Sequence, residues 1–138
     1  RVMSSIAIDA VCEKYIKRKA ERHLEKGRII ILAAGTGNPY FTTDSAASLR
    51  AIELNAQIML KGTKVDGIYD KDPIKHSNAV LYKSISYSDI LKKNLKVMDA
   101  TAVVMCKENN MPLKVFNILK KGSLKKAILS DKIGTKIG

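Results

Sequence analysis

The chain of 138 residues has no tryptophan, only 5% aromatic residues and only two cysteines. Cys12 and Cys106 lack the Cys-x-x-Cys spacing of redox and zinc motifs, and neither His23 nor His76 lies close enough in sequence to complete a zinc set. We therefore expect two buried cysteines, two solvated histidines and no metal site made of protein ligands. The shortage of aromatic residues also weakens any reading in which nucleic-acid bases stack on the protein.

Long apolar runs are absent as well. No run reaches the roughly 18 residues that cross a bilayer, and residues 1–3 show no signal-peptide pattern. Apolar residues make up 46% of the chain and are dispersed among charges, and a domain of this size buries roughly two-thirds of its unfolded surface. These features predict a globular cytoplasmic protein without membrane association.

What the chain has in excess is positive charge. Lysine and arginine number 25 against 13 aspartate and glutamate residues, which gives a formal net charge of +12. Such a charge indicates a negatively charged binding partner, whether nucleic acid, nucleotides or an acidic membrane surface. The lysines are scattered, as is typical of solubility, so a nucleic-acid-binding module with steep salt dependence is the less favoured alternative.

The hydrophobic pattern alternates between helical and strand-like segments. Helices are expected over residues 10–26, with Asp9 as N-cap, and over 45–55, 100–109 and 123–129, with a short helix after the capping box at 86–89. Strands are expected over residues 28–32, 57–60, 113–116 and 135–137. This order predicts an α/β fold with a mainly parallel sheet.

The most informative segment follows the first expected strand. Residues 33–47 read Ala-Ala-Gly-Thr-Gly-Asn-Pro-Tyr-Phe-Thr-Thr-Asp-Ser-Ala-Ala, so a glycine-rich bend leads into a helix N-terminus with outward-pointing N–H groups. The segment matches neither the dinucleotide fingerprint, which needs a third glycine, nor the P-loop, which needs Gly-Lys-Ser/Thr. It is typical of a phosphate-binding loop, although plain connectors and Thr-Thr-Asp N-caps have the same composition.

A second glycine-containing loop, residues 61–67, leaves the carboxyl end of the strand expected at 57–60. Ligands of open α/β sheets bind beyond the carboxyl ends of the strands, so both loops are expected to face a ligand. Residues 68–78 are expected to be irregular and polar. Plain structural readings stay open here: Asp66-Gly67 as a turn, Tyr69 as a partly buried aromatic residue and Asp99 as an N-cap.

Three motifs in order resemble the bacterial UMP kinase family: residues 35–47, residues 63–69 with Asp72-Pro73, and Lys96-Val97-Met98-Asp99. The resemblance covers nearly the whole chain and implies the amino-acid kinase fold, a three-layer α/β sandwich with a mainly parallel sheet. It also implies that the γ-phosphoryl group of ATP is transferred to UMP, with Mg²⁺, in pyrimidine nucleotide biosynthesis, and that the complete protein is a homohexamer.

The resemblance assigns roles to individual residues. Asp44 and Asp99 lie where the superfamily places acidic groups that orient catalytic lysines or helix ends. ATP would be contacted by Thr63, Tyr69 and Asp72. UMP would be held by eight consecutive residues, Thr36, Gly37, Asn38, Pro39, Tyr40, Phe41, Thr42 and Thr43.

The family begins with a further segment in which a Lys-x-Ser-Gly turn and glycine-rich loops carry a phosphate-clamping lysine and an arginine. This segment is not in the sequence. We therefore expect residues 1–138 to be the C-terminal, ATP-binding portion of an amino-acid kinase domain, with the N-terminal portion absent and little activity alone. A family member with another acceptor is the alternative, against which the Gly-Asn-Pro-Tyr-Phe-Thr-Thr run argues.

Overall fold

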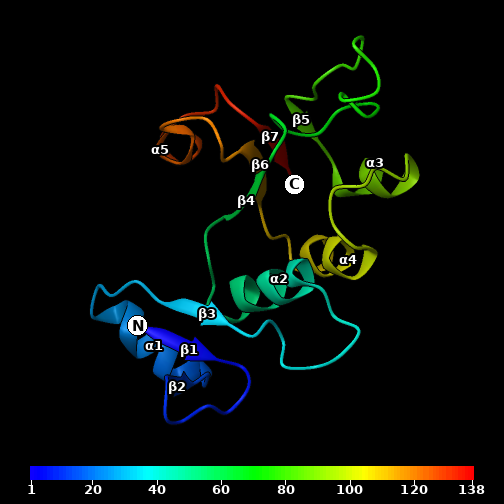
Figure 1. The fold of residues 1–138 in the computed structure, drawn as a ribbon. Helices are drawn as coiled ribbons and strands as arrows, with labels where there is room; N and C mark the ends of the chain where they lie inside the picture. Colours follow the sequence, from blue (N-terminus) through cyan, green and yellow to red (C-terminus); the bar gives the residue numbers. More distant parts are fainter. The chain divides into compact units, whose positions relative to one another are not determined.

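The computed structural model describes all 138 residues, and these divide into two compact units. The N-terminal unit comprises residues 1–56 and the C-terminal unit residues 57–138. Figure 1 shows a sheet and helices in each of them. No helix of the structure is both long and apolar enough to span a bilayer.

The N-terminal unit contains a three-stranded parallel sheet in the order β2-β1-β3. Met3, at the centre of this sheet, is fully buried, as is Ala20 on α1. The elements are β1 (Val2–Ser4), β2 (Glu13–Lys14), α1 (Lys17–Glu25), β3 (Ile31–Ala33) and α2 (Thr43–Glu53).

The first helix is much shorter than the sequence predicts. It begins at Lys17 rather than near residue 10, its N-cap is Ile16 rather than Asp9, and residues 13–14 form β2 instead. Pairing with β1 outweighs the helical pattern, since the Tyr15 N–H donates to Ser4 O at 2.7 Å. Val11, expected on the apolar face of the predicted helix, is 78% exposed.

Two predictions about single residues in this unit are also wrong. Cys12 is half-buried rather than buried, because it lies in the turn that leads into β2. His23 is shielded rather than solvated, because its ring lies between Glu13 and Arg28 and contacts both side chains. Cys106 is buried and His76 is exposed, as expected.

The C-terminal unit contains a four-stranded sheet in the order β4-β6-β7-β5. In Figure 1, α5 lies to one side of β4, β6 and β7, and α3 and α4 lie to the other. The elements are β4 (Met59–Thr63), β5 (Ser84–Ile85), α3 (Tyr87–Lys92), α4 (Ala100–Glu108), β6 (Leu113–Asn117), α5 (Ser123–Leu129) and β7 (Thr135–Ile137). Only the pairing of β6 with β7 is antiparallel among the pairings of these strands, so the mainly parallel α/β fold is confirmed.

The sequence predicts the C-terminal unit more closely than the N-terminal unit. Ser86 Oγ accepts from the Asp89 N–H at 3.0 Å and Asp99 Oδ1 from the Ala102 N–H at 3.0 Å, which confirms both predicted helix caps. The predicted strand at 57–60 is shifted, since β4 begins at Met59 and continues to Thr63. Its extension follows from pairing with β6, where Thr63 is in register with Asn117.

The core of the C-terminal unit is centred on β6. Leu113, Val115 and Phe116 are each at most 2% exposed. Lys114 is equally buried, and its ammonium group donates to Ala127 O at 2.9 Å and to Ser130 O at 2.6 Å. Its burial is tolerated because the carbonyl groups at the end of α5 replace water around the ammonium group, and because Asp131 Oδ1 lies 3.4 Å from Nζ as a counter-charge.

Candidate functional site

In the N-terminal unit, residues 34–42 form the connection between β3 and α2, here called the 34–42 loop. Its backbone is left-handed at four positions, Ala34, Gly35, Gly37 and Tyr40, with φ of 63°, 57°, 75° and 66°. A Cβ at residue 37 would lie 3.1 Å from Ser5 O, so glycine is required there for both conformation and space.

Threonine side chains of the 34–42 loop accept hydrogen bonds from backbone N–H groups of the loop and of the first turn of α2. Thr42 is the N-cap of α2, and its Oγ1 accepts from the N–H groups of Asp44 at 3.1 Å and Ser45 at 3.2 Å. Thr36 Oγ1 accepts from the Asn38 N–H at 3.1 Å. Thr42 is therefore an N-cap, as the plain structural interpretation of Thr-Thr-Asp predicts. The exposed residues before Thr42 form a bend ahead of α2.

Its side chains face solvent at the tip. Tyr40 is fully exposed, and Phe41 is also exposed. Asn38 and Pro39 are exposed too, whereas Thr36 is half-buried. The eight residues predicted to hold UMP are thus contiguous and accessible within the N-terminal unit.

A polar network supports the 34–42 loop from behind. Ser5 Oγ donates to Gly35 O at 2.7 Å and accepts from Arg50 Nη2 at 3.0 Å. Arg50 Nη1 donates to Glu53 Oε2 at 2.7 Å, and the guanidinium carbon lies 3.8 Å from the centroid of the Tyr15 ring. No local sequence pattern predicts this network, because Ser5 and Tyr15 lie far along the chain from Arg50 and Glu53.

The same network shifts two pKa values. Burial, aided by the hydrogen bond that it donates to Glu53, raises the pKa of Tyr15 to about 12. For Glu53, burial is the largest influence and raises the pKa, but the hydrogen bonds from Arg50 and Tyr15 outweigh it and lower the pKa below 4.5. Glu53 is consequently a carboxylate that neutralises Arg50 behind the loop.

In the C-terminal unit a pocket of about 510 Å³ opens beyond the carboxyl end of β4, here called the β4 pocket. It brings together Thr63, Tyr69 and Asp72, the three residues predicted to contact ATP. Its lining also includes three lysines that the sequence did not single out as ligands, Lys71, Lys93 and Lys96. The available signal was closeness to the motifs, since Lys71 precedes Asp72 of the second motif and Lys96 opens the third.

Polar contacts within the chain hold the wall of the β4 pocket in shape. Thr63 Oγ1 donates to Val65 O at 2.7 Å, and Asp72 Oδ1 accepts from the Ile74 N–H at 2.9 Å. Asp70 Oδ1 accepts from the Val80 N–H at 2.7 Å, next to a bridge that pairs Tyr69 with Leu81. The irregular segment expected at 68–78 is thus folded back on itself as an ordered hairpin-like loop.

The two acidic residues predicted to be catalytic belong to different units. Asp44 is half-buried in the first turn of α2 and Asp99 is the N-cap of α4, so each lies at a helix N-terminus. Neither is among the residues that line the β4 pocket, although Val97, near Asp99 in sequence, is. A negative charge is favourable at both places because of the helix dipole.

A model of the amino acid kinase family matches residues 2–117, so the chain belongs to this family. It is similar to the uridylate kinase of Dichelobacter nodosus strain VCS1703A, with 56% identity over 135 residues, 98% of this chain and 56% of that protein. The resemblance stated from the three sequence motifs is confirmed.

Solved structures give the same result. The UMP kinase from Bacillus anthracis matches 100% of this chain and 57% of its own, with a TM-score of 0.97 and 37% identity. The UMP kinase from Ureaplasma parvum matches 99% and 59%, with a TM-score of 0.95 and 41% identity. This chain therefore spans somewhat more than half the length of these relatives.

Proposed function

We propose that this chain supplies nucleotide-binding parts of a UMP kinase, which transfers the γ-phosphoryl group of ATP to UMP and releases UDP and ADP. The observation that carries the proposal is the 56% identity to a uridylate kinase over 98% of the chain. The cytoplasmic location and the homohexamer expected from the resemblance belong to the same proposal.

The 34–42 loop, with Thr43, is proposed to hold UMP. Its hydroxyl and amide side chains donate hydrogen bonds, and α2 adds the positive end of its dipole. One such helix end contributes roughly 0.3–1 kcal/mol when exposed and up to about 2 kcal/mol when partly buried. Useful catalysis needs about 8 kcal/mol or more, so cations elsewhere in the enzyme must supply most of it.

The β4 pocket is proposed to hold ATP. Its volume of about 510 Å³ lies within the roughly 300–1,000 Å³ of small-molecule sites. Tyr69 and three lysines are among the lining residues, and we propose that Tyr69 contacts the adenosine and that the lysines attract the phosphates. Because phosphoryl transfer passes through a loose transition state, positioning and charge are what the protein has to provide.

Mg²⁺ is the metal ion that ATP-dependent phosphoryl transfer implies. No three His, Cys, Asp or Glu side chains gather as a set that could hold a metal ion. Asp70 and Asp72, on the wall of the β4 pocket, each accept a backbone N–H. We propose that Mg²⁺ arrives with ATP, because this ion is commonly bound through substrate phosphates and its own waters.

The test is UDP formation by the full-length polypeptide that contains residues 1–138, with ATP as donor. We expect UMP to be phosphorylated in preference to amino-acid or carbamate acceptors. Asp99→Ala should lower kcat more than it raises either KM, as expected for a residue that organises the transition state. Transfer to another acceptor but not to UMP would refute the proposed substrate, and equal losses in kcat and binding would refute the role of Asp99.

A further inference from the structure

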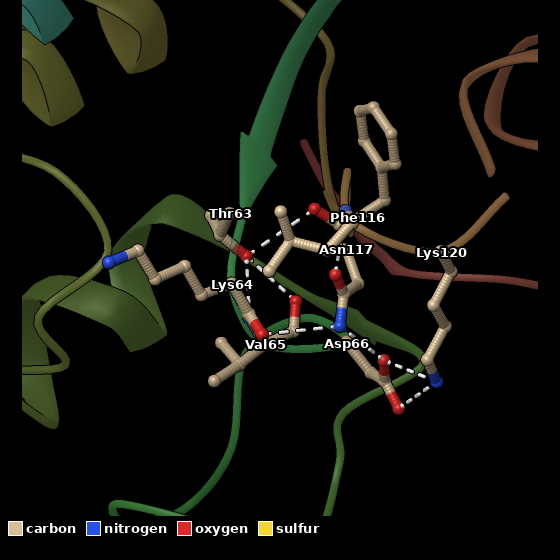
Figure 2. Close-up of polar contacts among 8 residues, drawn as sticks. Thr63, Lys64, Val65, Asp66, Phe116, Asn117 and Lys120 are labelled. Atoms are coloured by element: carbon tan, nitrogen blue, oxygen red, sulfur yellow. Dashed lines mark hydrogen bonds and ion pairs between the residues drawn. The ribbon is translucent and has the colours of Figure 1, made fainter.

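Three side chains gather where β4 and β6 end side by side. The two strands are parallel and Thr63 is in register with Asn117, so the segments that follow them leave from the same edge of the sheet. Figure 2 shows Asp66 from the segment after β4, Asn117 at the end of β6 and Lys120 from the segment after β6, pointing toward one another. We call these three residues the Asp66 cluster.

The contacts of the Asp66 cluster are short and mutually dependent. Lys120 Nζ lies 2.7 Å from Asp66 Oδ1 and 2.8 Å from Oδ2. Asn117 Nδ2 donates to Asp66 Oδ1 at 3.1 Å and to Lys64 O at 3.2 Å, and its Oδ1 accepts from the Leu119 N–H at 3.0 Å. Asn117 therefore uses both ends of its amide to join the segment after β4 to the segment after β6 (Figure 2).

The cluster acts on the wall of the β4 pocket from outside. Thr63, Val65 and Gly67 line the pocket, whereas Lys64 and Asp66, which alternate with them, do not. The far end of this wall is already fixed, because the Ile68 N–H donates to Thr135 Oγ1 at 2.9 Å and Gly67 packs against the same residue. The cluster thus fixes the end of the wall nearest β4.

The charge pair of the cluster is too exposed to matter much for folding. The Asp66 and Lys120 side chains are 40% and 64% exposed, and exposed pairs typically contribute about 0–1 kcal/mol to stability. The hydrogen bond from Lys120, followed by that from Asn117, nevertheless keeps the pKa of Asp66 below its usual value. The carboxylate is therefore always charged near neutral pH, and its Oδ1 also accepts the Asn117 bond.

We infer that Asp66, Asn117 and Lys120 are positioning residues for ATP, which hold Thr63 and Val65 in the place where the β4 pocket receives the nucleotide. The inference rests on the proposed function and assigns these residues no contact with ATP. Loss of the cluster lets the wall relax without unfolding the unit, so the cost falls on ATP affinity rather than on stability.

The experiment compares Asp66→Asn, Lys120→Met and the double variant in the full-length protein, with Lys121→Met as matched control. Lys121 is the neighbouring exposed lysine, so its replacement changes the net charge equally. Each single change should raise the KM for ATP about three- to tenfold with the KM for UMP unchanged, and the double variant should match the single variants because the effects are coupled. Lys120→Arg should restore the KM for ATP.

The outcomes separate the inference from the proposed function. Failure of the unaltered protein to form UDP refutes the proposed function, and the inference falls with it. With an active protein, three results would each overturn the inference alone: an unchanged KM for ATP, an equal rise for UMP, or a lower melting temperature with normal kinetics. A rise in the KM for ATP after Lys121→Met would also overturn it, because net charge alone would then explain the effect.

Discussion

The two glycine-containing loops that are proposed to bind nucleotides are built in different ways. In the 34–42 loop the backbone is left-handed at four residues and the tip is solvated. In the second loop neither Gly62, within β4, nor Gly67, after it, has a left-handed φ, and Gly67 is buried against Thr135 and Leu81. Glycine supplies conformation in the first loop, and at Gly37 space as well, whereas Gly67 in the second loop supplies space alone, so the second loop depends more on tertiary packing.

The contacts that support the two loops also differ. The 34–42 loop is joined to α2 by the Thr42 cap and supported from behind by the bond from Ser5 to Gly35 O, with Arg50 and Glu53 next in the network. The wall of the β4 pocket is held at both ends, by the Asp66 cluster and by Thr135. Substitutions in the second loop should therefore cost more stability when they alter packing than when they alter surface charge.

The largest expected effect on stability comes from replacing one glycine of each loop, Gly67 and Gly35, with alanine. In Gly67→Ala the new Cβ would lie 2.5 Å from Thr135 Oγ1 and 3.0 Å from Leu81 Cδ1, and such overpacking costs about 1–3 kcal/mol, of which we expect the upper end. In Gly35→Ala the new Cβ would contact only Ala46 Cβ, at 3.9 Å. The expected loss of stability there is about 1–2 kcal/mol, because alanine is strained at a left-handed φ. Urea unfolding of the two variants measures the difference, and a larger loss in Gly35→Ala would contradict it.

A smaller effect is expected at the support of the first loop. Arg50→Met removes the partner of Glu53 and of Ser5 at a site where Arg50 is only 14% exposed, and we expect a loss of about 1–2 kcal/mol because partly buried polar groups are left unpaired. Arg22→Met serves as the control. Its pair with Glu25 is 67% and 62% exposed, so the expected change is about 0.5 kcal/mol or less. Equal losses in the two variants would mean that the buried network does not support the loop.

The smallest effect concerns pH. The pKa of Glu53 is lower in the folded protein than its ordinary 4.5, so its carboxylate stabilises the fold above that value and loses this contribution as the pH falls through the folded-state pKa. Glu53→Gln lacks that contribution. We expect the stability difference between the two proteins to shrink between neutral pH and about pH 3, as measured by unfolding at each pH. If the stability difference between the two proteins grew as the pH falls, Glu53 would not stabilise the fold as a carboxylate.

The sequence predicts what short-range patterns control. The caps at Ser86 and Asp99 were correct because a side chain bonds a backbone N–H three residues away. The first helix was wrong because pairing of β2 with β1 competes with the helical pattern of residues 10–16. The residues predicted to contact ATP do line one pocket, but their supports were missed, since Asp66 and Lys120 are 54 residues apart.

By itself the sequence determined the family, the alternation of helices and strands, and the two loops that carry the nucleotide motifs. The family follows from the resemblance carried by three motifs, whereas the helices, strands and loops follow from local chemistry: glycine positions, helix caps and hydrophobic periodicity. Tertiary structure alone decided where β4 ends, which residues support each loop and which lysines border the β4 pocket. The physical reason is that strand pairing and ion pairing join residues distant in the chain, and no local pattern specifies their partners.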